Sequence, residues 1–213
     1  SGFLYGMSTA SSMITSGRYK NVLLIGADKM SSIVDYEDRA TCIIFGDGAG
    51  AVLFEASDSD FGWEDEYLRS DGSGRKYLNI KAGGSLLPTS RLTVENKMHN
   101  LYQDGKTVFK YAVSRMSDAT EQIIKRNKID PKKIAYLVPH QANSRIIDAT
   151  AKRINLPTEK VMRNIEKYGN TTAATLPLLL KDYEKKLRPG DKLIFAAFGG
   201  GFTWGAAYLT WSY

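Results

Sequence analysis

The amino-acid sequence predicts an α/β fold with a largely covered sheet. Three short, continuous apolar runs are typical of buried strands, and they lie at residues 22–25, at 134–138 and at 193–198, within the predicted strand 192–198. By contrast, the apolar residues between Val108 and Ile124 recur at helical spacing, with Ser, Asp, Glu and Lys between them. Because strand-like and helix-like segments alternate along the chain, we expect a layered α/β structure.

The first 58 residues are predicted to form one structural unit. The elements expected in it are a helix at residues 1–16 ended by Gly17, a strand at 21–26 covered on both faces, and a hairpin whose strands, 42–45 and 51–54, flank the glycine-rich residues 46–50. A polar run, Ser57-Asp58-Ser59-Asp60, follows these elements. Because the composition changes there, we divide the chain into units 1–58 and 59–213.

The second unit should contain most of the sheet and the long amphipathic helix. The elements expected in it are a short strand at 77–80, a surface loop at 81–99 that could act as a flap over a site, the helix from Val108, a strand at 134–138 followed by a helix through Ala151, a helix at 171–183, and closing strands at 192–198 and 202–211. The long helix should stop near Asp130-Pro131, because proline disfavours a helical conformation in the preceding residue.

The composition is that of an ordinary globular protein, with 43% hydrophobic and 24% charged residues. The 29 Lys and Arg residues are scattered against 23 Asp and Glu residues, so we expect no nucleic-acid partner, and the excess suits a phosphorylated ligand or an acidic protein. No apolar run reaches about 18 residues, so we expect no membrane span. The single cysteine, Cys42, lies in an apolar run and is interpreted as a packed residue of a cytoplasmic protein rather than a reactive thiol.

Three features could carry chemistry. His140 follows a buried strand directly, where α/β folds place their ligands, although a hydrogen-bonded core histidine would fit equally well. Asn170 follows Gly169 at the start of a predicted helix, and it could be a ligand-binding amide or a helix N-cap. The triple glycine 199–201 permits close backbone approach to a ligand, or simply a tight hairpin. His99 lies in the predicted loop and is interpreted as a surface residue.

Four motifs, in order along the whole chain, resemble the 3-oxoacyl-acyl-carrier-protein synthase III family, the initiating β-ketoacyl synthases of bacterial fatty-acid synthesis. They are Asp38-Arg39-Ala40-Thr41 with Phe45-Gly46-Asp47-Gly48-Ala49-Gly50, Val138-Pro139-His140-Gln141-Ala142-Asn143, Tyr168-Gly169-Asn170-Thr171-Thr172-Ala173-Ala174, and Phe198-Gly199-Gly200-Gly201-Phe202-Thr203-Trp204-Gly205. The resemblance implies a thiolase-like layered αβαβα fold, with most of the N-terminal half lacking from this sequence.

The resemblance also implies a reaction. An acyl-CoA primer, acetyl-CoA in many members, and malonyl-acyl-carrier-protein would undergo a decarboxylating Claisen condensation to 3-oxoacyl-acyl-carrier-protein. The nucleophilic cysteine of the family directly precedes the counterpart of Ser1-Gly2-Phe3, and Cys42 does not match its position. The 213 residues would therefore hold two members of a Cys-His-Asn triad and be inactive alone.

Roles for individual residues follow from the same resemblance. The catalytic residues would be His140 and Asn170, both donating hydrogen bonds to the malonyl thioester oxygen. The remaining assignments are Gly200 for the oxyanion hole, Phe198 for the substrate pocket, Arg39, Phe109, Ala142 and Asn143 for coenzyme A, and Gln141, Arg145 and Lys110 for docking of the carrier protein. No metal and no cofactor are implied, because acyl-CoA is a substrate.

The family implies a homodimer, and two other interpretations stay open. One is a related condensing enzyme, such as a polyketide starter synthase or a hydroxymethylglutaryl-CoA synthase. The other is a non-catalytic fragment or pseudoenzyme that binds acyl-CoA or carrier protein.

Overall fold

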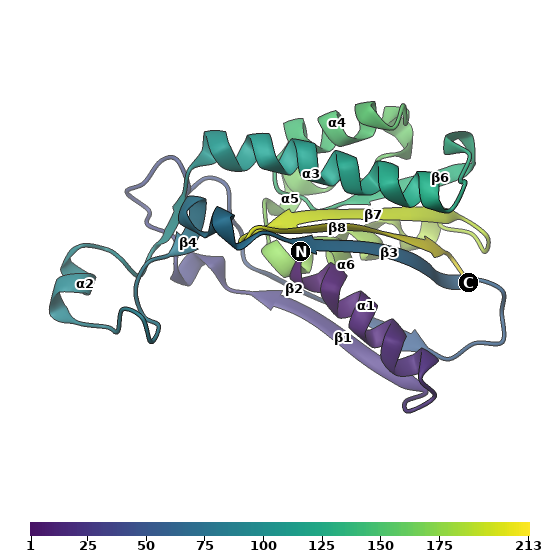
Figure 1. The fold of residues 1–213 in the computed structure, drawn as a ribbon, viewed down its shortest axis with the longest axis horizontal. Helices are drawn as coiled ribbons and strands as arrows, with labels where there is room; N and C mark the ends of the chain where they lie inside the picture. Colours follow the sequence, from purple (N-terminus) through teal and green to yellow (C-terminus); the bar gives the residue numbers. More distant parts are fainter.

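The computed structural model describes all 213 residues as a stack of layers (Figure 1). One outer layer consists of α3 (Gly105–Arg126) and α4 (Ser144–Arg153), which lie on a sheet with the order β3 (Gly62–Ser70), β8 (Thr203–Thr210), β7 (Lys192–Gly199) and β6 (Ile134–Pro139). Beneath the sheet lie α1 (Gly2–Thr15) and α6 (Thr175–Tyr183), followed by the two-stranded ribbon of β1 (Asn21–Asp28) and β2 (Gly48–Glu55). This arrangement confirms the predicted layered α/β class.

Shorter elements connect these layers. They are α2 (Arg91–Glu95), α5 (Ile165–Tyr168), the paired strands β4 (Leu78–Ile80) and β5 (Leu101–Gln103), and 3-10 helices at Met30–Ser32, Gly72–Tyr77, Pro131–Lys133, Thr158–Lys160, Thr172–Ala174 and Glu184–Lys186. None of the helices combines the length and the apolar character that crossing a bilayer requires.

The central strand β7 explains why its sequence is continuously apolar. It pairs in parallel with β6 and antiparallel with β8, so it has neighbours on both edges. Its side chains alternate between the two helical layers: Ile194 and Phe198 join the cluster under α3 and α4, whereas Phe195 joins the cluster around α1 and α6. Both faces are therefore buried, as expected for a strand between two helical layers.

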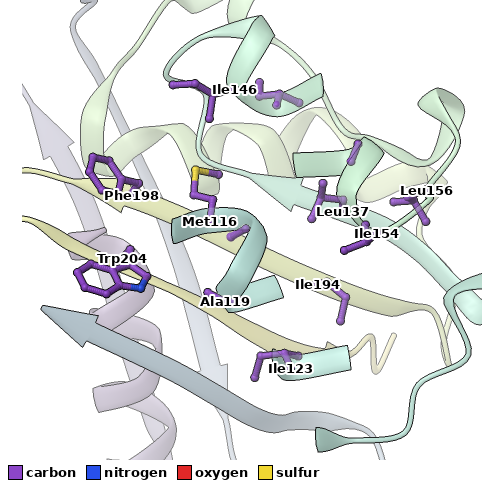
Figure 2. Close-up of a cluster of buried hydrophobic side chains, with 14 of the residues drawn as sticks. Met116, Ala119, Ile123, Leu137, Ile146, Ile154, Leu156, Ile194, Phe198 and Trp204 are labelled. Atoms are coloured by element: carbon purple, nitrogen blue, oxygen red, sulfur yellow. The ribbon is translucent and has the colours of Figure 1, made fainter. Parts of the chain in front are cut away.

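In the larger of these clusters, shown in Figure 2, the buried side chains of α3 pack against the sheet. Met116, Ala119 and Ile123 of α3 are almost fully buried, and they pack with Ile194 of β7 and Ile146 of α4. Each large apolar side chain buried in this way contributes about 1.5–3 kcal/mol to folding. The amphipathic pattern from Val108 to Ile124 correctly predicted this helix. The apolar residues of the pattern are the ones that α3 buries in this cluster.

The ribbon of β1 and β2 is covered on one face only. Leu24 and Phe54 pack against the cluster around α1 and α6. On the opposite face, Leu23, Ile25 and Leu53 are 60%, 61% and 54% exposed. In the structure of these 213 residues, the expectation that β1 is covered on both faces is therefore wrong. Its outward face is an apolar surface of the kind that another element usually covers.

The hairpin predicted around residues 46–50 is also wrong. Residues 42–45 form a turn and an isolated bridge, and β2 pairs instead with β1. The physical reason is that the backbone of residues 44–46 pairs with a segment that is distant in sequence. The Gly46 N–H donates to the Asn170 carbonyl at 3.0 Å, and the Asn170 N–H donates to the Ile44 carbonyl at 3.0 Å. Cys42 is accordingly a half-buried residue of a turn rather than of a strand.

Strand β3 was not predicted, because its sequence is acidic rather than apolar. It is an edge strand paired only with β8, and its carboxylates have partners outside the ladder. Asp65 forms an ion pair with Arg126 of α3, and Glu66 accepts hydrogen bonds from Ser8 and from the Trp63 indole. The change from the ribbon to the larger sheet falls between Glu55 and Gly62, close to the predicted boundary after residue 58, although the division into units 1–58 and 59–213 remains a prediction.

The predicted loop at 81–99 is an arm that extends away from the layers (Figure 1). It carries the short helix α2, which begins with a capping box between Ser90 and Thr93. Leu86 and Leu92 on it are 88% and 67% exposed. None of residues 81–100 lines the cavity described below, so the arm does not act as a flap in this structure.

Candidate active site

A cavity of about 570 Å³ lies at the carboxyl ends of the parallel strands β6 and β7. This is the position at which open α/β sheets bind their ligands. Segments from both predicted units contribute to its wall. Of the residues with predicted roles, those that line it are His140, Asn170, Gly200, Phe198, Phe109, Ala142 and Asn143. The structure therefore brings together both candidate catalytic residues and most of the candidate ligand-binding residues.

His140 is held rigidly at the end of β6. Its backbone N–H donates to the Ala196 carbonyl at 2.8 Å, and its ring Nδ1 lies 2.6 Å from the Thr175 hydroxyl oxygen. Burial lowers the pKa of His140 to about 3, so the imidazole is neutral near pH 7. The ring is both a hydrogen-bonded core group and part of the cavity wall, and its Nε2 makes no hydrogen bond within the protein.

Asn170 is positioned by its backbone and by one end of its side chain. Gly169 before it adopts φ 67°, and the Asn170 N–H and C=O are both paired with residues 44–46. The side-chain Oδ1 accepts a hydrogen bond from the Thr172 N–H at 2.9 Å. Local turn bonding, the alternative to ligand binding, thus uses only the amide oxygen, and the Nδ2 donor is left for a ligand in the cavity.

The glycine turn between β7 and β8 passes close to the start of α1. A Cβ atom on Gly199 would lie only 2.9 Å from the Ser1 nitrogen, so a larger residue would not fit there. Gly200, next in the chain, lines the cavity. Phe198 is 4% exposed and packs on Phe202, with 4.8 Å between the ring centroids. The triple glycine therefore forms a hairpin and also permits the close approach that its composition suggested.

Three of the four residues assigned to coenzyme A line the cavity, and the fourth lies outside its wall. Phe109, Ala142 and Asn143 line the cavity, and Asn143 also caps α4 by accepting a hydrogen bond from a backbone N–H at 2.9 Å. Arg39 is exposed and does not line the cavity, but Ala40 beside it does. Arg39 is therefore placed at the margin, where it would meet the outer part of a ligand.

Two of the residues assigned to carrier-protein docking are exposed near the cavity. The Arg145 guanidinium carbon lies 5.0 Å from the centroid of the Phe109 ring, and Phe109 lines the cavity. Lys110 follows Phe109 on α3 and is exposed. These two basic side chains thus lie on the surface beside residues of the cavity wall.

The assignment of Gln141 to docking is wrong. Its side chain has 0% exposure, its Nε2 donates to the Pro139 carbonyl at 2.8 Å, and its Oε1 accepts from the Asn164 N–H at 3.1 Å. A buried amide with both ends paired cannot meet a partner protein. Gln141 instead fixes the loop that follows His140 to the segment before α5.

Replacing Gln141 with leucine should therefore reduce stability rather than partner affinity. The change leaves the Asn164 N–H and the Pro139 carbonyl without this partner, and each buried group left unpaired costs about 1–3 kcal/mol. Urea unfolding of the complete protein measures the loss, and Gln122→Leu, the same change at an exposed position of α3, is the control. A stable Gln141→Leu variant with weaker carrier-protein binding would contradict this role.

Sequence reasoning gave no role to several polar residues in or beside the cavity, of which Asp28 and Thr175 matter most here. Asp28 ends β1 and lines the cavity, and its Oδ2 accepts a hydrogen bond from the Ala173 N–H at 2.9 Å. The signal for it was present, because Asp28 is a polar residue at the end of an apolar strand. Thr175, the partner of the His140 ring, lies 35 residues away in sequence and gave no such signal.

The layered fold, with a cavity at the strand ends that contains a histidine, an asparagine and a glycine turn, is thiolase-like. Comparison with known families agrees. Residues 1–72 match the family described as 3-Oxoacyl-[acyl-carrier-protein (ACP)] synthase III, and residues 124–211 match the C-terminal part of the same enzyme. The chain belongs to the 3-oxoacyl-acyl-carrier-protein synthase III family.

Individual relatives show the same pattern. A β-ketoacyl-acyl-carrier-protein synthase III of Phocaeicola vulgatus is 59% identical over 212 residues, which are 100% of this chain and 64% of the relative. The crystal structure of 3-oxoacyl-(acyl carrier protein) synthase III from Pseudomonas aeruginosa PAO1 has a TM-score of 0.90 and 37% identity, covering 100% of this chain and 65% of that one. The priming β-ketosynthase of the R1128 polyketide pathway has a TM-score of 0.86 and 29% identity, covering 99% and 63%. The chain thus spans less than two thirds of these proteins.

Proposed function

We propose that the protein to which these residues belong condenses an acyl-CoA primer with malonyl-acyl-carrier-protein, releasing carbon dioxide, to give 3-oxoacyl-acyl-carrier-protein. The observation that carries this proposal is a pair of side-chain nitrogens, His140 Nε2 and Asn170 Nδ2, that line one cavity and have no hydrogen-bond partner within the protein. Neutral His140 and the Nδ2 group of Asn170 line the cavity together, and each is fixed by hydrogen bonds made through its other polar atom. Such an arrangement suits an oxygen that gains negative charge during a reaction.

The two donors would act on the malonyl group. When the bond to the carboxylate breaks and carbon dioxide leaves, the electron pair moves toward the thioester oxygen and forms an enolate. Hydrogen bonds from His140 Nε2 and Asn170 Nδ2 would stabilise that oxygen, each contributing about 3 kcal/mol. The enolate carbon then attacks the acyl thioester on the nucleophile, a carbon–carbon bond forms, and the nucleophile leaves as a thiolate.

The acyl-transfer half of the reaction needs a nucleophile, which by the family resemblance would be a cysteine. By that resemblance it would directly precede Ser1, at the amino end of α1, where the helix dipole favours a thiolate. Cys42 lies in a turn and does not line the cavity, so it is no substitute. We therefore expect the 213 residues alone to form no acyl-enzyme. The closeness of the Gly199 backbone to Ser1 supports an oxyanion hole made by the Gly200 N–H.

Substrate and partner contacts complete the proposal. Coenzyme A would bind along Phe109, Ala142 and Asn143 with Arg39 at the margin, and no cofactor would be needed. The acidic carrier protein would dock at Arg145 and Lys110, where charge attraction mainly speeds encounter. A cytoplasmic homodimer is the expected form, as the family implies.

Arg145→Ala in the complete protein should raise the apparent KM for the carrier protein about twofold to fivefold, the equivalent of a rim ion pair worth up to about 1 kcal/mol. The dependence of KM on salt should weaken as well, because one screened charge contact is lost. Arg18→Ala is the matched control: Arg18 is exposed beyond the far end of the 14-residue α1, about 20 Å from its cavity end. An Arg145→Ala effect no larger than that of Arg18→Ala would count against docking at this surface.

The proposal is tested by incubating the complete protein with acetyl-CoA and malonyl-acyl-carrier-protein and identifying the product by mass spectrometry. A 3-oxoacyl-acyl-carrier-protein product is expected. The similarity to a priming β-ketosynthase supports a second candidate, a polyketide-type condensing enzyme. A preference for malonyl-CoA over the carrier-linked substrate would favour a related condensing enzyme of that kind. Binding of acyl-CoA or carrier protein without any condensation product would favour a non-catalytic protein and contradict the proposal.

A further inference from the structure

Thr175 provides the one hydrogen bond that the His140 ring makes within the protein. Its Oγ1 lies 2.6 Å from the ring Nδ1. Both residues are buried, with Thr175 2% and His140 8% exposed. Because Thr175 is the first residue of α6, the ring also lies beside a helix N-terminus, whose partial positive charge disfavours an imidazolium. The contact therefore joins a neutral ring to a single hydroxyl group.

The hydroxyl group of Thr175 has one proton and two possible acceptors. These are Nδ1 of His140 and the Thr172 carbonyl oxygen, which lies at 2.9 Å. The backbone N–H of Thr175 already donates to that same carbonyl. The hydroxyl can therefore donate to His140 without leaving the Thr172 carbonyl unpaired.

The direction of this hydrogen bond decides which ring nitrogen carries the proton. If the hydroxyl donates to Nδ1, the proton of the neutral imidazole must be on Nε2, which is then a donor. If Nδ1–H donates to the hydroxyl instead, Nε2 has only a lone pair and would repel an oxygen that becomes negative. Only the first arrangement can assist decarboxylation.

We propose that Thr175 is a positioning residue that holds His140 as the Nε2–H tautomer and thereby makes it a donor toward the substrate oxygen. This inference rests on the proposed function, since the reaction is what requires the donor. The residue that would control the His140 tautomer thus lies on α6, an element that contains neither His140 nor Asn170.

The turn that links Asn170 to Thr175 supports a shared role in orientation. Thr172 adopts φ 51°, a left-handed conformation that β-branched residues rarely occupy. In that conformation its N–H holds Oδ1 of Asn170, while its carbonyl accepts the backbone N–H of Thr175. One turn of chain thus fixes the amide donor directly and the imidazole donor through the hydroxyl.

The test combines a spectroscopic and a kinetic measurement on the complete protein labelled with ¹⁵N-histidine. Protonated and unprotonated ring nitrogens give well-separated ¹⁵N resonances, and His99→Gln assigns the signals of the other histidine in this sequence. In the wild type, Nε2 of His140 should carry the proton. In Thr175→Val, which keeps the side-chain shape, the Nδ1–H form should appear. Malonyl decarboxylation should then fall about 10- to 100-fold, by analogy with the loss of a partner that orients a metal-bound histidine.

Thr175→Ser is the matched control, because it keeps the hydroxyl and should restore both the Nε2–H signal and the rate of decarboxylation. Acyl transfer should be unaffected in all variants. The proposal is overturned if the wild-type ring carries its proton on Nδ1, a result that needs no variant to fold. It is equally overturned if Thr175→Val keeps the wild-type tautomer and rate. A wild-type protein that shows the Nε2–H signal but forms no condensation product would contradict the proposed function instead.

Discussion

Replacing either His140 or Asn170 with alanine in the complete protein should lower malonyl decarboxylation by about 100-fold or more. Each change removes one donor from the oxygen that becomes the enolate oxygen. Transfer of the acyl group to the nucleophile should continue, because neither side chain is needed to deliver it. The two steps are separated by following radiolabelled acetyl-enzyme formation and carbon dioxide release in each variant.

The control for these variants is His99→Ala. His99 lies on the arm, bonds to the Thr93 hydroxyl and does not line the cavity, so its removal should change neither step. Normal carbon dioxide release by His140→Ala would show that another group stabilises the enolate. Normal carbon dioxide release by Asn170→Ala would reduce the hydrogen bond from Thr172 to Asn170 to a local turn contact.

Gly46→Ala should lower malonyl decarboxylation about as much as His140→Ala or Asn170→Ala does, although Gly46 is not a catalytic residue. A Cβ atom there would fall well inside contact distance of the Tyr168 carbonyl oxygen, and the Gly46 N–H holds the Asn170 carbonyl at 3.0 Å. The backbone must shift, and a displacement of about 1 Å can reduce a rate about 100-fold. We expect decarboxylation to fall to that extent, with a loss of stability of about 1–3 kcal/mol from overpacking.

Urea unfolding and carbon dioxide release measure the two effects separately. Gly72→Ala is the control, because a Cβ atom at Gly72 meets no other atom within 4 Å. If Gly46→Ala decarboxylated malonyl at the rate of Gly72→Ala, the pairing of residues 44–46 with Asn170 would have no role in positioning the amide.

The fold was predictable where burial dictates the sequence. Strand β7 and helix α3 were predicted because side chains covered on both faces, or on one helical stripe, must be apolar. Strand β3 was missed because an edge strand can carry carboxylates when a partner such as Arg126 neutralises them. The glycines at 46–50 suggested a hairpin. At Gly46, however, the lack of a side chain allows the backbone to lie close to the segment of Tyr168 and Asn170.

The site was predictable to a similar degree. His140, Asn170 and the triple glycine 199–201 were singled out because each lies next to a strand end or a turn, and the resemblance then assigned Gly200 to the oxyanion hole. Gln141 was misassigned because the resemblance alone gave it a docking role, and only the contact with Asn164 shows that it is buried and paired. Thr175 could not be predicted, because its role depends on a contact across 35 residues that no local pattern encodes.

The most direct test of the central claim is a crystal structure of the complete protein with a malonyl thioester analogue that cannot lose carbon dioxide. If His140 and Asn170 stabilise the enolate, the thioester oxygen should lie about 2.7–3.1 Å from both His140 Nε2 and Asn170 Nδ2. A thioester oxygen bound by other groups, with these two nitrogens turned away from it, would contradict the account.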